Sequence, residues 1–417
     1  MHLESFTMGL VGTVGISVLI FTLYILILVG IMILAKAKLA ATGDVKLHIN
    51  DDESLTKTVP AGNTVLTTLS STGLLLPSAC GGGGTCGLCK VQILDGAGDI
   101  LPTELGHISR QEAKDKWRLG CQVKVKNDLK LKIPDEIFNI KKFNCTVRSN
   151  KNVATFIKEL ILDIDEGKEL NFKAGGYIQI DIPAFGEIPF TSFDIQEKYR
   201  DAWDNFKLWD IVATSDEPVF RAYSMANHPA EGNRVMLNVR IATPPPKTDL
   251  PPGIASSYIF SLKPGDKVTI SGPFGEFFVK DTEREMCFIG GGAGMAPMRS
   301  HIYHQFHTEH TKRKTTFWYG ARSVREMFYH DEFLEIQKNN PNFEYQVALS
   351  DPQPEDNWDG PSGFIHQVAH DRYLKDHEDP SEIEYYLCGP PMMLAAVNKM
   401  LYDLGVEQEM IAYDEFG

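Results

Sequence analysis

The chain has 417 residues, with 41 Lys and Arg against 55 Asp and Glu, and a formal net charge of −14. This length exceeds what one hydrophobic core supports and indicates roughly two to four domains. With 43% hydrophobic and 23% charged residues, the composition is that of globular proteins. The negative charge argues against nucleic acid and against an anionic membrane surface as the main partner.

The N-terminal stretch Ser5–Ala35 contains no charged residue and no histidine. As a helix it would be about 46 Å long, more than the roughly 30 Å of a hydrocarbon core. A cleaved signal peptide would have a basic start and a shorter apolar run, and a buried core helix is rarely this long. Residues 1–36 are therefore expected to form a single-pass transmembrane anchor. Because Lys36 and Lys38 follow the run and Glu4 precedes it, the later domains are expected on the cytoplasmic side.

Residues 43–134 alternate as short strands and helices. The pattern predicts a small mixed sheet with a helix packed on it. The expected helix-terminal residues are an Asn63 cap, a closing Gly73 and a Ser109–Glu112 capping box. The expected strands are 45–49, 56–59, 91–93, 123–125 and 129–133.

Within this segment, Pro77–Lys90 holds three cysteines among five glycines, and a fourth cysteine follows Gly120. The spacing is C-x5-C-x2-C…C, and the predicted metal ligands are Cys80, Cys86, Cys89 and Cys121. Four thiolates are the ligand set of a [2Fe–2S] cluster, and glycines let a loop aim its amide groups at the sulfurs. Zinc remains the main alternative, although its sites usually show two tight ligand pairs. A disulfide framework is less favoured, because Cys145, Cys287 and Cys388 are scattered singly.

Residues 135–280 read as short strands separated by turn signals, which predicts an antiparallel barrel. The expected strands are 145–147, 156–162, 177–182, 236–241 and 268–270. Two motifs in it suit a flavin diphosphate: Arg221-Ala-Tyr-Ser224 ends a strand, and Gly253-Ile-Ala-Ser-Ser257 opens a helix with free amide donors.

An acidic, aromatic insertion lies between Pro189 and Phe220. Its apolar residues at helical spacing are Ile195, Tyr199, Trp203 and Phe206. The stripe fits packing on its own domain, and it also fits a docking face for partner subunits or a membrane.

Residues 281–417 alternate between strands and helices, which predicts a doubly wound parallel sheet. Strands are expected at 286–289, 316–319, 343–348 and 385–387. Gly290-Gly-Gly-Ala-Gly294-Met-Ala-Pro297 follows the first strand, Tyr319-Gly-Ala-Arg322 the second, and Cys388-Gly-Pro-Pro391 the last. All three lie at strand C-terminal ends, where such sheets bind ligands, so they predict a dinucleotide site.

The longer cysteine loop resembles ferredoxin domains of the F subunits of sodium-translocating NADH:quinone oxidoreductases. The barrel motifs, followed by Gly272-Pro-Phe-Gly275, and the three glycine motifs resemble the ferredoxin–NADP⁺ reductase superfamily. The resemblance covers essentially the whole chain. It implies a multidomain α/β protein: a transmembrane helix, a β-grasp 2Fe-2S ferredoxin domain, an antiparallel β-barrel FAD domain and a doubly wound parallel NADH domain.

The resemblance also implies the function. NADH is the donor, FAD the first acceptor and the 2Fe-2S cluster the exit. Electron transport then runs through other subunits of a membrane complex to ubiquinone and is coupled to sodium transport at a bacterial inner membrane. The choice of NADH over NADPH rests on the resemblance alone.

The residues expected to bind FAD are Arg221, Ala222, Tyr223, Ser224, Asn238, Val239, Arg240, Gly253, Ser256, Ser257 and Phe416, whose ring could stack over the flavin. Those expected to bind NADH are Gly290, Gly291, Gly292, Ala293, Gly294, Met295, Pro297, Gly320, Arg322, Cys388, Gly389 and Pro390. Ser224 and Cys388 are the catalytic candidates, bordering flavin N5 and nicotinamide C4. Hydride transfer itself needs no acid or base from the protein.

Two other functions remain open. The same three modules make up the reductase component of a multicomponent monooxygenase, which is usually without a membrane span. A non-enzymatic iron–sulfur sensor with a degenerate reductase fold is the second, and its purified protein would lack flavin absorbance.

Overall fold

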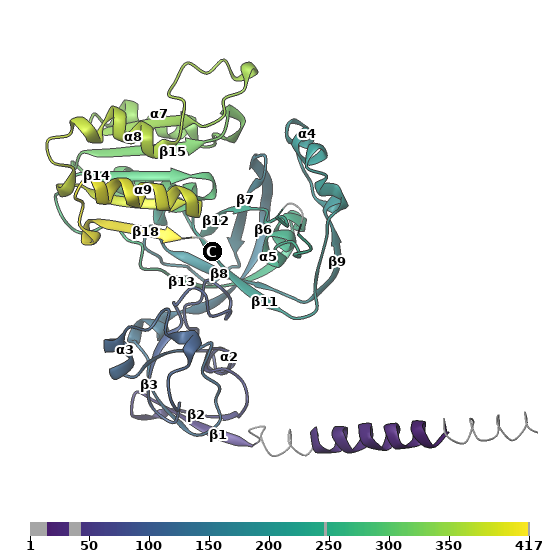
Figure 1. The fold of residues 1–417 in the computed structure, drawn as a ribbon. Coiled ribbons are helices and arrows are strands. Elements are labelled where there is room, and N and C mark those ends of the chain that lie inside the picture. The colour runs from purple at the N-terminus through teal and green to yellow at the C-terminus, as the bar shows by residue number, and fades with distance from the viewer. Residues whose placement is uncertain (1–14, 33–42, 246–247, 416–417) are drawn as a thin grey trace, which may run out of the picture. The chain divides into compact units, whose positions relative to one another are not determined.

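The structure is a computed structural model that describes residues 15–32, 43–245 and 248–415 (Figure 1). The chain divides into two compact units, each described in turn below. The first comprises Met1–Thr72 and Lys90–Pro134, and the second comprises Gly73–Cys89 and Asp135–Gly417. The lysines expected to orient the anchor, Lys36 and Lys38, lie outside the described residues, as does Phe416.

The N-terminal helix covers Gly15–Met32 and has a mean hydropathy of 2.6. None of this window is buried against the rest of the protein. By length and composition it can cross a membrane.

The first unit is built on a five-stranded mixed sheet with the order β2-β1-β5-β3-β4. Its strands are β1 (Asp44–Ile49), β2 (Asp52–Pro60), β3 (Lys90–Asp95), β4 (Trp117–Leu119) and β5 (Leu129–Lys132). Only β1 and β5 pair in parallel. Two helices, α2 (Val65–Ser71) and α3 (Arg110–Lys114), accompany the sheet. The alternating residues Leu47, Ile49 and Leu131 are buried, as expected of a sheet with one covered face.

Two local predictions for this unit are wrong. The N-cap of α2 is Thr64, whose hydroxyl accepts a hydrogen bond from Thr67 N, and not Asn63. Both residue types cap helices well, so sequence preference could not separate them. Residues 123–125 form no strand; Lys124 makes a single bridge to Thr64. The Ser109–Glu112 capping box is confirmed at the start of α3.

The barrel of the second unit is a six-stranded sheet with the order β11-β8-β13-β6-β7-β12. The strands are β6 (Lys141–Ala154), β7 (Ile157–Ile164), β8 (Tyr177–Ile182), β11 (Val219–Ser224), β12 (Arg234–Arg240) and β13 (Lys267–Phe274). Every pairing is antiparallel. A bridge between Met225 and Leu237 joins the two outer strands and closes the barrel. The helix α5 (Ile254–Ser261) begins after Gly253, as predicted.

The insertion forms a hairpin of β9 (Phe185–Pro189) and β10 (Val212–Ser215) with α4 (Glu197–Asn205) between them. Ile195, Tyr199 and Trp203 pack into the barrel core. This confirms packing on the chain's own domain for these three. Phe206 follows the helix and is 60% exposed.

The last part of the second unit is a parallel five-stranded sheet with the order β16-β15-β14-β17-β18. Its strands are β14 (Met286–Gly291), β15 (Thr315–Ala321), β16 (Phe343–Leu349), β17 (Glu384–Gly389) and β18 (Ile411–Glu415). Alternate strand residues pack on α6 (Met295–Tyr303) and α7 (His330–Asn339) on one face. The others pack on α8 (Ile365–Arg372) and α9 (Pro391–Asp403), which lie together over one side of the sheet in Figure 1. The doubly wound sheet is as predicted, with β18 as an additional strand.

Candidate functional site

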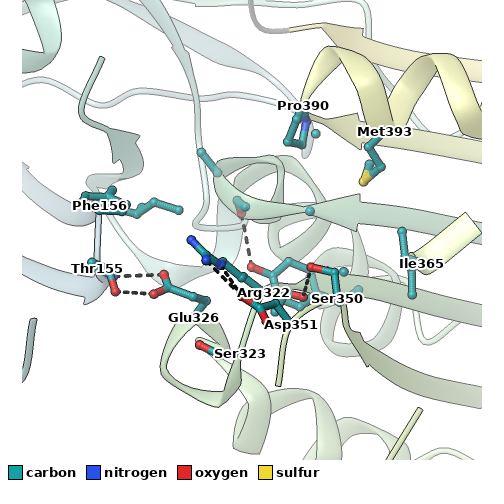
Figure 2. A pocket seen from close by; sticks show the side chains of 18 of the residues that line it. Thr155, Phe156, Arg322, Ser323, Glu326, Ser350, Asp351, Ile365, Pro390 and Met393 are labelled. Carbon is teal, nitrogen blue, oxygen red and sulfur yellow. Dashed lines mark hydrogen bonds and ion pairs between the residues drawn. The ribbon is translucent and has the colours of Figure 1, made fainter. Parts of the chain in front are cut away.

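A cavity of about 1090 Å³ lies where the barrel meets the C-terminal ends of the parallel strands. Figure 2 shows Thr155 and Phe156 of the barrel on one side, and Arg322, Asp351 and Pro390 from three strand ends of the sheet. Ligand pockets usually enclose about 300–1000 Å³, so this one is large enough for a dinucleotide. Parallel sheets bind ligands at this edge.

The cavity collects most of the residues expected to bind the dinucleotide. The members that line it are Gly291, Gly292, Ala293, Gly294, Gly320, Arg322, Gly389 and Pro390. Four others, Gly290, Met295, Pro297 and Cys388, are buried and do not appear in its wall. One residue predicted for FAD, Arg240, also lines the cavity. The three glycine motifs therefore meet in space, although they are far apart in sequence.

Gly294 shows why the glycine loop needs its residue type. A Cβ at Gly294 would lie 2.1 Å from the Cys388 carbonyl oxygen, a distance no side chain can occupy. The start of α6 therefore rests directly on the end of β17. The amide groups at a helix start favour negative charge, so this is where a pyrophosphate would bind.

The end of β16 adds a residue outside the three predicted motifs. Asp351 lines the cavity and pairs with Arg322, whose Nη2 lies 3.0 Å from Asp351 Oδ2. Both side chains are more than half exposed, so the pair is accessible to a ligand. A carboxylate that follows a parallel strand and lines the same cavity as the glycine loop is suited to accept hydrogen bonds from a ribose.

Two barrel residues expected to bind FAD carry a buried polar atom that lacks a partner among the described residues. Ser257 is fully buried, and neither its Oγ nor Asn238 Oδ1 has a hydrogen-bond partner. Buried polar atoms are normally hydrogen-bonded, so each points to a group that binds there. Ser256 differs: its Oγ donates to Gly253 O and accepts from Ala242 N. These orphaned atoms fit a bound FAD, with Ser257 the better candidate of the two serines.

The Arg221–Ser224 motif runs along β11. Arg221 Nη1 donates to the neighbouring Phe220 carbonyl at 2.7 Å. A Cβ at Gly81 would lie 2.2 Å from that same Nη1, so the cysteine loop rests on this arginine. Tyr223 is half-buried against the barrel core, and burial raises the pKa of its phenol. A role for Arg221 toward the diphosphate stays a prediction.

The two catalytic candidates are connected through Asp414. Ser224 Oγ donates to Asp414 Oδ2 at 2.6 Å. Asp414 is the register partner of Cys388 in the β17–β18 pair. Burial raises the pKa of the Asp414 carboxyl, and the Ser224 hydrogen bond offsets part of that rise. The structure thus links Ser224, through a half-buried carboxyl group, to the strand that pairs with Cys388.

The cysteine loop holds its sulfurs with its own backbone. Cys80 Sγ lies 3.3 Å from Cys86 Sγ. Burial alone would raise the pKa of Cys80, but the backbone N–H groups of Thr85, Cys86 and Gly82 outweigh it and lower the pKa to about 6. A thiolate stabilised by backbone donors is the form that binds iron.

Cys89 and Cys121 are both buried; Cys89 belongs to the loop, and Cys121 follows β4 in the first unit. In the described part of the chain, no group of three or more His, Cys, Asp or Glu side chains is placed to hold one metal ion. The thiolates of a [2Fe–2S] cluster come from four cysteines, and the close pair Cys80 and Cys86 would supply two of them. The loop fits the cluster, and the complete ligand set stays a prediction.

Comparison with known families identifies three domains. An oxidoreductase NAD-binding domain matches residues 288–399, a 2Fe-2S iron-sulfur cluster binding domain matches 48–126, and an oxidoreductase FAD-binding domain matches 208–279. These domains account for the predicted cofactors.

Two solved structures are similar over most of the chain. Amycolatopsis cytochrome P450 reductase GcoB has a TM-score of 0.62 at 23% identity, covering 89% of this chain and 98% of that chain. The ferredoxin reductase in carbazole 1,9a-dioxygenase has a TM-score of 0.58 at 25% identity, with 90% and 99% covered. The first, at this identity, shows the fold alone.

Sequence relatives are much more similar. The Actinobacillus succinogenes F subunit of Na(+)-translocating NADH-quinone reductase is 59% identical over 398 residues, 95% of this chain and 97% of the relative. Its Mannheimia succiniciproducens counterpart is 58% identical with the same coverage, and the Klebsiella pneumoniae counterpart is 58% identical over 96% of this chain and 99% of the relative. The chain therefore belongs to the family of F subunits of Na⁺-translocating NADH-quinone reductases.

Proposed function

We propose that this chain is the electron-input component of a Na⁺-translocating NADH:quinone oxidoreductase. It oxidises NADH and passes the electrons through partner subunits to a quinone. The observation that carries the proposal is the 57–59% identity to the F subunits of such enzymes over at least 95% of the chain. The dinucleotide cavity and the thiol pair of the cysteine loop support it independently.

The three cofactors divide the chemistry. NADH gives up a hydride, a flavin accepts it and releases electrons singly, and a [2Fe–2S] cluster carries one electron at a time. The chain's own residues supply the sites. The start of α6 would hold the pyrophosphate of NADH, Ser257 and Asn238 would hold FAD, and Cys80, Cys86, Cys89 and Cys121 would hold the cluster.

The N-terminal helix would keep this electron flow at a membrane. We place the chain in the bacterial inner membrane as a single-pass protein, with its folded units on the cytoplasmic side where NADH is available. The described helix, Gly15–Met32, has no Asp, Glu, Lys or Arg. Any path for Na⁺ would therefore have to involve other subunits.

A monooxygenase reductase has less support. The two similar reductases are at most 25% identical to this chain, whereas the F-subunit relatives are more than twice as similar and match almost end to end. No observation on the molecule favours a hydroxylase partner.

The test is an anaerobic NADH titration of the full chain purified in detergent. FAD takes two electrons and a [2Fe–2S] cluster takes one, so full reduction should need about 1.5 NADH per chain. We expect bleaching of the flavin absorbance together with a paramagnetic cluster signal. A preparation without flavin absorbance, or one that saturates without any cluster signal, would contradict the proposal.

A second measurement addresses the membrane. Removal of residues 1–35 should release a protein that still reduces ferricyanide with NADH but no longer reduces quinone in membranes that contain the partner subunits. Retained quinone reduction would show that the anchor is not needed for coupling.

A further inference from the structure

We infer that the insertion between β9 and β10 forms one wall of the adenosine end of the NADH cavity, with Phe206 as a stacking platform for the adenine ring. This inference rests on the proposed function, since it assigns a part of NADH to a part of the cavity. It gives the insertion a role in binding the dinucleotide and does not require it to be a docking face.

The two faces of α4 contact different surroundings. Tyr199 and Trp203, four residues apart, are buried in the barrel core. Asp201 and Asn205, also four apart, line the cavity, together with Phe206 just after the helix. Residues at this spacing lie on one face of a helix. The helix therefore presents one side to its own barrel and another to the dinucleotide cavity.

The wall is fastened to the nucleotide-binding sheet by Arg325. Its Nη2 lies 2.7 Å from Asp201 Oδ1 and donates to the Lys198 carbonyl at 2.6 Å. The adjacent Glu326 binds the barrel as well, accepting a hydrogen bond from Thr155 N at 3.1 Å and another from the Thr155 hydroxyl (Figure 2). Both sheet residues follow β15, so α4 is held beside the end of that strand.

Sheet order identifies which half of the dinucleotide lies there. Gly294 contacts Cys388 where β14 meets β17. Under the proposed function, these two motifs would bind the pyrophosphate and the nicotinamide. β15 lies on the opposite side of β14. In doubly wound sheets the adenosine half extends from the glycine loop toward the strand next to it. The wall built by α4 and Arg325 therefore borders the adenosine.

Phe206 is the exposed aromatic residue of this wall. Phe364, also exposed, lines the cavity from the start of α8 and stacks on His366, so it does not belong to the wall built by α4 and Arg325. It is 60% exposed even though it lines the cavity. Its ring meets Phe156 edge to face, with the centroids 5.8 Å apart at 72°, which leaves ring surface open. Water around an exposed aromatic ring is unfavourable, and a planar base that covers the ring would remove this apolar surface from water. Aromatic side chains can stack on any of the bases.

The test compares Phe206→Ala with the wild-type full chain in ferricyanide reduction, using NADH and reduced nicotinamide mononucleotide, which lacks the adenosine. Loss of base stacking should raise the KM for NADH roughly tenfold. The KM for the mononucleotide should change less than twofold, because that substrate does not reach Phe206. Phe206→Trp should keep the wild-type KM for NADH.

Tyr402→Ala removes a ring that is 80% exposed outside the cavity and serves as the matched control; both KM values should stay at wild-type levels. An equal rise of KM for both substrates, no rise for either, or loss of FAD from Phe206→Ala would overturn the inference. If the wild-type chain oxidises neither substrate, the proposed function has failed. If it oxidises NADH and Phe206→Ala behaves like the wild type, only the inference has failed.

Discussion

The cysteine loop and the dinucleotide cavity solve the problem of positioning a redox group in different ways. In the loop, neighbouring residues do the work: Cys80 and Cys86 are six residues apart, and backbone N–H groups between Gly82 and Cys86 stabilise the first sulfur. In the cavity, the residues come from positions between Thr155 and Ala396, and two partly exposed ion pairs lie in its wall. An iron–sulfur cluster stays bound during turnover and needs a rigid binding loop. NADH enters and leaves in each cycle and needs an accessible cavity.

Cys86→Ala should have the largest effect, because it should disable the cysteine loop and leave the dinucleotide cavity intact. Removal of one thiolate from a four-ligand set should abolish the paramagnetic signal of the cluster completely. FAD binding and NADH-dependent ferricyanide reduction should remain, since the barrel and the cavity are untouched. Spectra of the reduced variant check both outcomes. Cys287→Ala, at a buried cysteine outside the loop, is the control, and its cluster signal should persist.

Ser257→Ala tests whether the Ser257 hydroxyl binds FAD or stabilises the fold. The Ser257 hydroxyl is buried without a partner among the described residues, so its removal should leave the melting temperature of the flavin-free protein unchanged or slightly higher. The dissociation constant for FAD should rise about tenfold if one good hydrogen bond is lost. Ser256→Ala should instead lower stability, because Ser256 bonds two backbone groups. Full FAD affinity in Ser257→Ala would remove this residue from the flavin site.

Asp351→Asn tests whether the exposed Asp351–Arg322 pair in the cavity selects NADH over NADPH. Without the carboxylate, Arg322 is free to pair with the 2′-phosphate of NADPH. Because the pair is exposed, its coupling is small, and kcat/KM for NADPH should rise roughly fivefold. Asp359→Asn, an exposed position that does not line the cavity, makes the same charge change as a control. An unchanged ratio of NADH to NADPH activity in Asp351→Asn would show that the 2′ position is read elsewhere.

Asp414→Asn should give the smallest effect. Burial raises the pKa of Asp414 in the folded protein, so the folded state binds its proton more tightly than the unfolded state. This carboxyl therefore costs stability as the pH rises above the unfolded pKa of about 4. The variant should melt slightly higher than the wild type at pH 8, with a smaller difference at pH 5. A lower melting temperature at both values would contradict the assignment.

Local patterns made much of the molecule predictable. The cysteine spacing, the helix start at Gly253 and the parallel strands with their glycine loops all depend on residues close in sequence. These features appear in the structure at nearly the expected residues, and the three matched domains agree with them.

The features that escaped prediction depend on distant contacts. Ser224 and Asp414 are 190 residues apart, and nothing near Asp414 in the sequence signals an acid that bonds to the barrel. Asp351 could be recognised as a candidate site residue only once the structure showed that it pairs with Arg322 and lines the same cavity. Phe206 fits the periodicity of an apolar stripe, but periodicity cannot show that the helix ends at Asn205 and leaves the next ring outside the core.

The strand β18 has a practical consequence for anyone who modifies this chain. It ends at Glu415, two residues before the last residue of the sequence, and one residue after a carboxyl group bonded to the barrel. A fusion partner or affinity tag appended after Gly417 would be separated from Asp414 by three residues, so the turnover of such a fusion should be compared with that of the untagged chain.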